Sequence, residues 1–481
     1  MYFGIIASFL FIIILIVKSC KRPKNFPPGP LFLPFIGSWY TIPGTKTENQ
    51  VHGWRKKYGN IIGHKMGHQY MVFISGFEEV VSGLKNSKFQ KRIQSKLFQS
   101  RTFDQNLGLF FADGEPWVEL RRFTLRYLSQ IFYSRLEEAM HDEMMNFFSN
   151  TQLGEITEVN NKFLQFSLNV SMNLLIATKL ENNTEKVDRF RYLTNRHFKV
   201  GRPVGIEIIY PFFRYFFNYD VQQESIRYAN LFILEHLQQH HATFDPNNIR
   251  DYIDAFLLKQ QEEKKLLNRV KYYSDEQIIS ALTDILQASN ESTGNTLAFV
   301  LLYVSLNPEI QDKIHKELDS VIGRDRFPKL DDRDSLPYCI AVLYEAMRIN
   351  SISPLSVSHF VEETTKFYGY TLPKNCLLFF ALNDIFMDAK EFGEQPELFK
   401  PERFLSSEMK SKLISFGLGK RSCVGETLAK NVMFLFITYF FQKYSITLPA
   451  GYEKPCTDAV SGFTNSAKPF KLIINERCSN K

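Results

Sequence analysis

Cys423 is the residue whose surroundings in the sequence point most clearly to chemistry. It lies in the glycine-rich stretch FGLGKRSCVGE, residues 416–426, directly before a helical pattern. At a helix N-terminus, unpaired amide N–H groups and the positive end of the dipole favour thiolate over thiol, and thiolate is the form that ligates iron. Gly419 and Gly425 lack side chains that would hold the backbone away from a flat ligand, and Arg421 can pair with an anionic group at the ligand's edge. A buried free cysteine beside a glycine turn is the alternative.

The complete spacing of this stretch is highly specific. Phe416, Gly419, Arg421, Cys423 and Gly425 match the pattern F-x-x-G-x-R-x-C-x-G, which resembles the haem loop of the cytochromes P450. The resemblance extends from a proline-rich hinge through nearly the whole chain, and separate motifs follow in the family order. It implies that the cofactor is haem b and that Cys423 is the metal ligand, as the axial thiolate on the haem iron.

A second motif of the same family pairs opposite charges on one helix face. Glu345 and Arg348 form an E-x-x-R pattern, in which the i, i+3 spacing brings the two charges together. Arg403 lies in the sequence PERF, which resembles a conserved element of the family. The resemblance implies a buried structural triad of these three residues behind the haem loop. Taken alone, such pairs usually lie on solvated helix faces.

Four further residues resemble family contacts to the haem propionates. Trp117 and Arg121 are four residues apart, so they lie one above the other on a helix face. An ordinary amphipathic helix with a half-buried tryptophan is the alternative for this pair. Arg92 and His359 match less specific propionate contacts, and a surface histidine is the alternative for His359. With Arg421 and Cys423, these residues form the expected cofactor site.

The sequence ASNEST, residues 288–293, lies within a long helical pattern and is similar to the family segment A-G-x-[DE]-T-[TS]. An acid followed by an alcohol can hold water and deliver protons to iron-bound dioxygen. We therefore expect Glu291 and Ser292 to be the catalytic proton relay, with Thr293 as the alternative alcohol. Ser289 replaces the usual glycine and Ser292 the usual threonine. Serine lacks the methyl group that restricts the rotamer, which predicts a less firmly oriented relay.

Apolar residues at three- and four-residue spacing dominate the chain after residue 110 and predict a mainly α architecture. Residues 64–75 alternate as a small antiparallel strand pair does. The longest pattern, residues 275–306, starts at a serine cap, stops before Asn307-Pro308 and would cross an entire domain. The P450 resemblance implies the same fold class, with a small β subdomain. The expected helices are 115–130, 136–150, 158–178, 221–240, 247–262, 275–306, 308–322, 336–349 and 424–443.

The N-terminal segment predicts a transmembrane helix. Residues 2–17 carry no charge and are almost wholly apolar, and a basic cluster at residues 18–24 follows. Their helix would be roughly 24 Å long at 1.5 Å per residue, close to the roughly 27 Å core of the endoplasmic-reticulum membrane. The basic cluster follows the apolar run instead of preceding it, which favours a retained anchor over a cleaved signal peptide. We expect an anchor at 1–20, a basic, proline-rich hinge at 21–44 and a cytoplasmic catalytic domain at 45–481.

Composition excludes several classes of protein. Hydrophobic residues make up 44% of the 481 residues, which excludes a disordered chain. The net charge of +7 comes from basic residues spread along the chain, which argues against nucleic acid as a partner. The six cysteines have no CxxC spacing for zinc and suit a reducing compartment.

The expected partners follow from the P450 resemblance and from motifs that the chain lacks. The sequence contains no flavin or nicotinamide motif, so electrons must come from NADPH-cytochrome P450 reductase, with cytochrome b5 as an optional second partner. Arg122, Arg126 and Lys420 would form a basic docking face for such an acidic protein. The apolar stretch 203–219 corresponds to the family's substrate-access lid and the loop 93–111 to the other pocket wall. Neither segment has a charge pattern that names the substrate.

The leading hypothesis is a microsomal monooxygenase that acts on a lipophilic steroid, terpenoid, fatty acid or xenobiotic, and two stretches resemble arthropod members of the family. Ser289 and Ser292 motivate the alternative of a haem-thiolate isomerase or dehydratase that needs no dioxygen. A non-catalytic haem or lipid carrier is a third hypothesis, which the intact thiolate loop disfavours.

Overall fold

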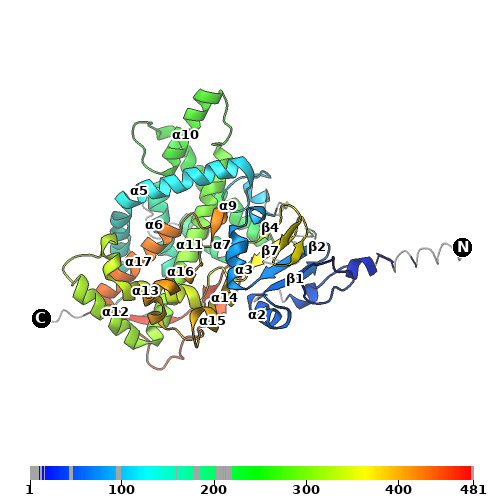
Figure 1. The fold of residues 1–481 in the computed structure, drawn as a ribbon. Coiled ribbons are helices and arrows are strands. Elements are labelled where there is room, and N and C mark those ends of the chain that lie inside the picture. The colour runs from blue at the N-terminus through cyan, green and yellow to red at the C-terminus, as the bar shows by residue number, and fades with distance from the viewer. Residues whose placement is uncertain are drawn as a thin grey trace.

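The computed structural model describes residues 10, 14–15, 17–42, 47–93, 99–158, 160–177, 185–201, 210, 212 and 219–477, with only the backbone of 130–134. Helices form most of the molecule and the sheets are small, as predicted. In Figure 1 the main sheet lies at the side from which the N-terminal end of the chain leaves. The helices fill the other side, where α12 (Pro308–Val321) and α17 (Glu426–Lys443) lie.

Long helices pack around a central one. The longer helices are α5 (Gly114–Ser149), α6 (Asn160–Ile176), α7 (Glu185–Val200), α9 (Tyr219–Thr243), α10 (Tyr252–Leu267), α11 (Asp275–Leu306), α12 (Pro308–Val321), α13 (Pro337–Ile349) and α17 (Glu426–Lys443). The shorter helices are α2 (Thr47–Tyr58), α3 (Phe77–Lys85), α14 (Leu382–Phe386), α15 (Ala389–Phe392), α16 (Ser407–Lys412), η1 (Trp39–Thr41), η2 (Ser87–Phe89), η3 (Ser100–Thr102), η5 (Leu330–Ser335), η6 (Pro401–Leu405) and η7 (Gly419–Arg421).

The main sheet has the strand order β1-β2-β7-β4, with β2 and β7 parallel and the other pairs antiparallel. Its strands are β1 (Ile61–Met66), β2 (Gln69–Ile74), β4 (His359–Phe360) and β7 (Leu377–Phe380). Smaller sheets pair β3 (Ile156–Glu158) and β8 (Tyr444–Thr447) with β11 (Lys471–Glu476), β5 (Thr365–Phe367) with β6 (Tyr370–Leu372), and β9 (Ala459–Val460) with β10 (Ser466–Ala467).

Both faces of the main sheet are buried. Because side chains alternate across a strand, Val72 and Ile74 of β2 pack into one apolar cluster and Met71 and Phe73 into another. Trp54 of α2 covers the second cluster. The predicted hairpin is therefore confirmed, but it is the outer part of a larger and fully covered sheet.

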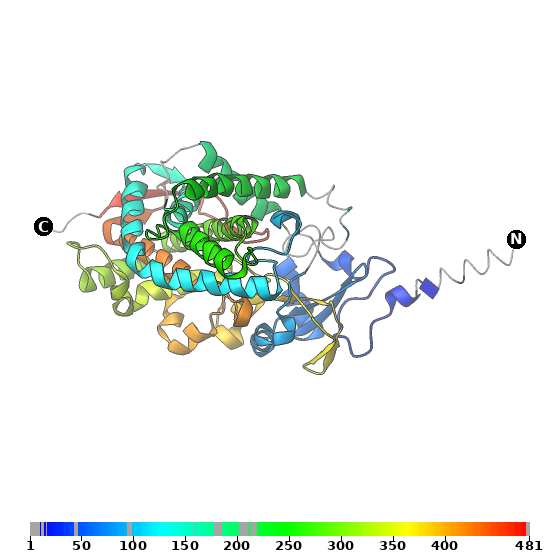
Figure 2. The same cartoon turned by 90° about the horizontal axis from the view of Figure 1, so that it is seen from above.

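Helix α11 runs through the middle of the helical side, as Figures 1 and 2 show, with the bounds that the sequence predicts. The Ser274 side chain caps its start by accepting a hydrogen bond from the Gln277 amide at 3.2 Å. Gly294 lets α11 approach α6 closely, since a Cβ there would lie 3.0 Å from the Leu164 Cα. The helix is buried along most of its length and can therefore contribute residues to an interior site.

Several helix predictions need correction. The two helices expected at 115–130 and 136–150 are one continuous helix, α5, which runs through Ser129 and Ser134 and contains no proline after Pro116. Helices α2, α3 and α7 were not predicted as helices, and α10 lies five residues later than expected. Its start is fixed by Asp251, whose side chain accepts a hydrogen bond from the Asp254 amide at 2.9 Å.

The predicted membrane anchor at residues 1–20 lies mostly outside the described residues. Among the helices that are described, none has the length and apolar character needed to span a membrane. The access segment 203–219 also falls largely outside the described residues.

Candidate functional site: a thiol loop beside a buried arginine cluster

Cys423 lies between η7 and α17 in a tightly closed loop. Its amide donates to the Phe416 carbonyl at 2.8 Å, and Gly417 and Gly419 take left-handed φ angles of 69° and 74° that let the chain turn. The Cys423 side chain is exposed, so its sulfur is accessible to a ligand.

Gly419 also has a role in packing within the protein. A Cβ at Gly419 would lie 2.6 Å from the Leu84 carbonyl oxygen, so this glycine is needed for packing on α3. Gly425 has an ordinary negative φ of −96°, and a Cβ there would lie 3.9 Å from the Cys423 sulfur. The close approach of the loop to α3 therefore explains why a glycine is needed at position 419.

The protein groups alone do not favour the Cys423 thiolate. Although the side chain has an exposed face, burial against its neighbours raises the pKa of Cys423, and the Glu426 charge adds to that rise. The Gly425 amide and the Arg121 charge act in the opposite direction without outweighing it. A bound cation would also act in the opposite direction and favour the thiolate.

Arg421 is buried against Trp117. Its guanidinium carbon lies 3.6 Å from the centre of the indole ring, and its Nε donates to the Gln90 carbonyl at 2.8 Å. It forms an ion pair with Asp113, a residue that the sequence did not single out. The Trp117 Nε1 donates to the Leu109 carbonyl at 3.1 Å, which fixes the indole orientation.

Arg92 and Arg121 complete the cluster. The Arg92 amide donates to the Asp113 carboxylate, and its Nη1 donates to the Val357 and Ser358 carbonyls at 2.9 and 2.8 Å. Arg121 lies one helical turn from Trp117, as predicted, with 5.8 Å between the guanidinium carbon and the ring centre. Its Nη2 donates to the Ser422 carbonyl at 2.8 Å, which joins α5 to the thiol loop.

The charges in this cluster do not balance. Among the described residues, Asp113 is the carboxylate that pairs with Arg421 and accepts from the Arg92 amide. Burial lowers the pKa of Arg92 to about 9 and of Arg421 to about 10, and each is also lowered by the neighbouring arginines. The buried Arg92 Nε and Arg421 Nη1 have no hydrogen-bond partner among the described residues. Such donors fit an anionic ligand with more than one negative group.

His359 lies beside the cluster on β4 and is not a surface residue. Its Nδ1 donates to the Phe89 carbonyl at 2.6 Å, and its ring packs edge-on against Phe380. Burial, and then the Arg92 charge, hold the pKa of His359 well below its usual value. The ring is therefore neutral until an anion approaches it.

On α11, the Glu291 side chain is hydrogen-bonded to two asparagines. Its carboxylate accepts from Asn295 Nδ2 at 2.9 Å and from Asn195 Nδ2 of α7 at 3.3 Å. Burial raises the pKa of Glu291 to about 7, and the Asn195 bond and the Lys199 charge oppose that rise. This carboxyl group can both hold and release a proton near neutral pH.

The alcohols that follow Glu291 are less tightly held. Ser292 is half-buried and Thr293 buried, and the Ser292 carbonyl accepts from the Thr296 hydroxyl at 2.8 Å. Ser289, which replaces the usual glycine, packs against α6, where the Ser167 hydroxyl donates to its carbonyl at 2.8 Å. The Ser289 hydroxyl itself donates to the Leu286 carbonyl of the same helix at 3.3 Å.

Glu345, Arg348 and Arg403 lie together and are buried, as predicted. Arg348 donates from Nε and Nη2 to both Glu345 oxygens at 2.8 Å, and the Arg403 Nε lies 3.5 Å from one of them. Arg348 also donates to the Phe386 and Pro396 carbonyls at 2.6 and 2.7 Å. The triad therefore fixes α13 to the segment that leads to the thiol loop.

A family model of cytochrome P450 matches residues 27–474, which include the thiol loop, the arginine cluster and the triad. The chain belongs to the cytochrome P450 family. It is a P450 monooxygenase, and its cofactor is haem b bound through a cysteine thiolate.

Known P450s resemble this chain along nearly all of its length. Farnesoate epoxidase of Bombyx mori is 30% identical over 483 residues, covering 96% of both proteins. Cytochrome P450 2C44 of Mus musculus is 32% identical over 466 residues, covering 94% of both. Cytochrome P450 2J2 of Homo sapiens is 29% identical over 465 residues, covering 94% of this chain and 91% of the human protein.

The residues of this P450 fit haem. The accessible Cys423 sulfur is a suitable iron ligand, and the unpartnered Arg92 and Arg421 donors suit the two propionates of the porphyrin. The single indole N–H of Trp117 already donates to the Leu109 carbonyl, so a hydrogen bond to a propionate would require this N–H to leave that carbonyl or to be shared with it.

Sequence reasoning missed three residues at the site of this P450. Asp113 and Asn195 act on residues that are distant in the sequence, so their roles follow only from the packing of the loop and α7 on the rest of the fold. Arg101, in the loop 93–111, was not singled out either. A charged residue in this otherwise mostly uncharged loop was the signal that could have drawn attention to it.

Proposed function

We propose that this P450 inserts one oxygen atom from dioxygen into a lipophilic substrate at the endoplasmic-reticulum membrane, with electrons from NADPH-cytochrome P450 reductase. The substrate classes are steroids, terpenoids, fatty acids and xenobiotics, and cytochrome b5 is an optional second electron donor. The similarity to Farnesoate epoxidase of Bombyx mori supports the terpenoid class. The apolar N-terminal stretch supports an anchor at 1–20, a hinge at 21–44 and a cytoplasmic catalytic domain at 45–481.

We assign the axial thiolate to Cys423 and the propionate contacts to Arg92, Trp117, Arg121, His359 and Arg421. The observation that carries this assignment is the excess positive charge of the buried arginine cluster, which Arg121 joins to the thiol loop through Ser422. Haem, when bound, supplies the redox chemistry that activates dioxygen. The arginines would neutralise its carboxylates and so hold it in one orientation.

We assign proton delivery to Glu291 and Ser292, with Thr293 as the alternative alcohol. Glu291 can hold a proton near neutral pH, and Asn195 and Asn295 orient its carboxyl group. The half-buried Ser292 hydroxyl is free to rotate toward a water molecule and pass the proton on. We assign a structural role to the Glu345, Arg348 and Arg403 triad, because Arg348 donates to the carboxylate and to backbone carbonyls, and the Arg403 Nη groups donate to backbone carbonyls.

Arg122, Arg126 and Lys420 are exposed next to the thiol loop, on α5 and η7. Since Arg121 of the same helix contacts Ser422, these cations lie near the thiolate side of the site. We assign them to the docking face for the acidic reductase.

Dependence on dioxygen and NADPH tests the proposed reaction. The full-length protein in lipid vesicles with reductase should convert a lipophilic substrate only when both are present, with one labelled oxygen atom from dioxygen in the product. Conversion without dioxygen or NADPH would support the isomerase alternative, which the serines at 289 and 292 motivate.

A further inference from the structure

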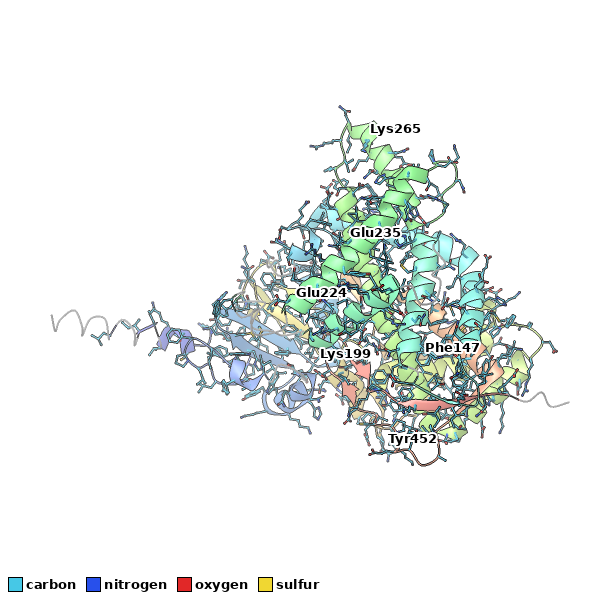
Figure 3. The ribbon with its side chains drawn as sticks, turned by 180° about the vertical axis from the view of Figure 1, so that it is seen from behind. Phe147, Lys199, Glu224, Glu235, Lys265 and Tyr452 are labelled. Carbon is cyan, nitrogen blue, oxygen red and sulfur yellow. The ribbon has the colours of Figure 1, made fainter. Side chains whose placement is uncertain are left out.

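The C-terminal end of α10 carries a group of exposed cations. Lys264 and Lys265 lie in its last turn, and Arg269 and Lys271 follow in the loop that leads to α11. Figure 3 shows Lys265 on the projecting end of this helix, at the edge of the molecule. We call residues 264–271 the α10 tip.

The cations of the α10 tip are poorly compensated by acidic groups. Among the described residues, no carboxylate forms an ion pair with Lys264, Lys265 or Arg269, and the neighbouring Glu262 pairs with Lys259 instead. Clustered cations of this kind attract an acidic surface and speed its approach. The tip therefore presents positive charge that is available to a partner.

Two exposed leucines lie between these cations. Leu266 is 83% exposed and Leu267 is 44% exposed. An apolar group with a charged border has the composition of a protein interface, whereas a small anion would leave both leucines in water. Anionic lipid has similar chemistry, but α10 projects from a different side of the molecule than the N-terminal end does (Figure 1). The tip therefore fits an acidic protein best.

The α10 tip is held in a fixed shape. The buried Glu263 carboxylate accepts hydrogen bonds from the amides of residues 271–273 at 2.7–3.3 Å, which folds the loop back onto the helix. The Gln260 Nε2 also donates to the Tyr273 carbonyl at 2.8 Å. Because the loop is already ordered, a partner that binds it loses less free energy to ordering the backbone.

The loop after the α10 tip packs on α5. The Tyr273 hydroxyl donates to Glu119 Oε1 at 3.0 Å, and the other Glu119 oxygen accepts from Arg122 at 2.7 Å. Arg121 projects from the other side of α5, since it lies two residues after Glu119, and it contacts Ser422 in the thiol loop. The α10 tip and the thiol loop therefore flank the same exposed ridge of α5.

We propose that the α10 tip is a second arm of the docking face, which the acidic reductase contacts together with Arg122, Arg126 and Lys420. This inference deepens the proposed function and rests on it, since it concerns the partner of that same face. A single patch leaves a docked protein free to rotate about the contact. Two separate contacts fix its orientation and so hold its electron-donating group in one position beside the thiol loop.

Electron transfer from the reductase tests this proposal. The haem-loaded, full-length protein in lipid vesicles is mixed with NADPH-reduced reductase under carbon monoxide, and the rate of haem reduction is measured at increasing reductase concentration. The triple variant Lys264→Glu/Lys265→Glu/Arg269→Glu should need at least 10-fold more reductase for the half-maximal rate at low salt. The difference should shrink at about 0.5 M sodium chloride, because salt screens exposed charges. A wild-type concentration dependence in this variant would overturn the proposal.

A second triple variant controls for the change in net charge. Arg227→Glu/Lys454→Glu/Lys471→Glu reverses three exposed cations away from the α10 tip and should change the half-maximal concentration less than 3-fold. Equal losses in both triple variants would refute a local contact at the tip. Both variants should keep the carbon monoxide band and the peroxide-supported turnover of the wild type. If the tip variant loses its haem, the single variant Lys265→Glu decides, with at least a 3-fold effect expected.

Cross-linking identifies what the α10 tip contacts. A carbodiimide joins a lysine amine directly to a touching carboxylate, and we expect such links between Lys264 or Lys265 and the reductase. Links confined to Lys420 would overturn the proposal. Weaker binding of the tip variant to phosphatidylserine vesicles, with an unchanged dependence on reductase, would assign the tip to lipid and refute it as well. Failure of the reductase to reduce the wild-type haem at any concentration would instead contradict the proposed function.

Discussion

Burying Arg92, Arg121 and Arg421 together costs free energy, because each guanidinium loses hydration and, among the described residues, Asp113 is the carboxylate that compensates Arg92 and Arg421. Their placement makes sense if haem propionates complete the cluster. Arg92 is the most informative of the three, since its Nε is buried without a partner among the described residues.

Arg92→Gln should therefore weaken haem binding. A charge-assisted hydrogen bond contributes roughly 1.5–3 kcal/mol, which corresponds to haem loss about 10- to 100-fold faster. Transfer of haem to excess apomyoglobin measures this rate, with Arg189→Gln as the exposed control. An unchanged rate in Arg92→Gln would remove Arg92 from the propionate site.

Ser292 is the least firmly oriented group of the expected proton relay, because serine lacks the methyl group that would restrict its rotamer. We expect Ser292→Ala to divert several-fold more of the NADPH electrons to hydrogen peroxide, and Ser292→Thr to divert fewer than the wild type. The ratio of product to peroxide per NADPH measures this effect. If both variants match the wild type, the proton passes through another group, with Thr293 the next to test.

Asn375 occupies a turn position that favours glycine, since its φ is +65°. Asparagine tolerates the left-handed region better than other non-glycine residues. The turn is therefore kept with little strain.

At the scale of elements, the Glu345 triad connects α13 to the segment before the thiol loop. Glu345→Ala would leave Arg348 buried without its carboxylate, and breaking a buried pair in this way costs about 3–5 kcal/mol. We expect the purified variant to lose most of its haem, measured as the ratio of haem to protein absorbance. Glu402→Ala, which removes the exposed partner of Lys313, is the control and should keep its haem. Normal haem content in Glu345→Ala would contradict the structural role.

The junction of α9 and α10 should make stability depend on pH. His240 Nε2 lies 2.6 Å from Asp251 Oδ2, and although burial lowers the pKa of His240, the bond and charge of Asp251 raise it above its usual value. The protonated pair therefore stabilises the fold fully below about pH 6.5, and this contribution is lost as the pH rises through the higher folded-state pKa.

The replacement His240→Gln should make the stability of the fold depend less on pH in this range. Thermal unfolding of wild type and variant between pH 5.5 and 8.5 measures the difference, which should be largest at low pH. A difference that is constant over this range would show that the pair does not titrate with folding. Although His240, Asp251 and Asp254 lie close enough to share a metal ion, Arg250 and backbone amides already occupy the carboxylates.

At the scale of the whole molecule, features set by local sequence were predictable and features set by packing were not. The bounds of α11 follow from a serine cap at one end and Asn307-Pro308 at the other. The continuity of α5 and the helical state of α7 had no comparable local signal. Cys423 and the triad were found through fixed spacings, whereas the contacts of Arg101 come from helices nearly a hundred residues or more away.

The thiolate loop is the feature on which the whole assignment depends, and the carbon monoxide difference spectrum of the reduced protein tests it most directly. The account predicts a band at the long wavelength typical of thiolate-ligated haem, which is lost in Cys423→Ser. A band at the shorter wavelength of haem without a thiolate in the wild type, or a long-wavelength band that persists in Cys423→Ser, would contradict it.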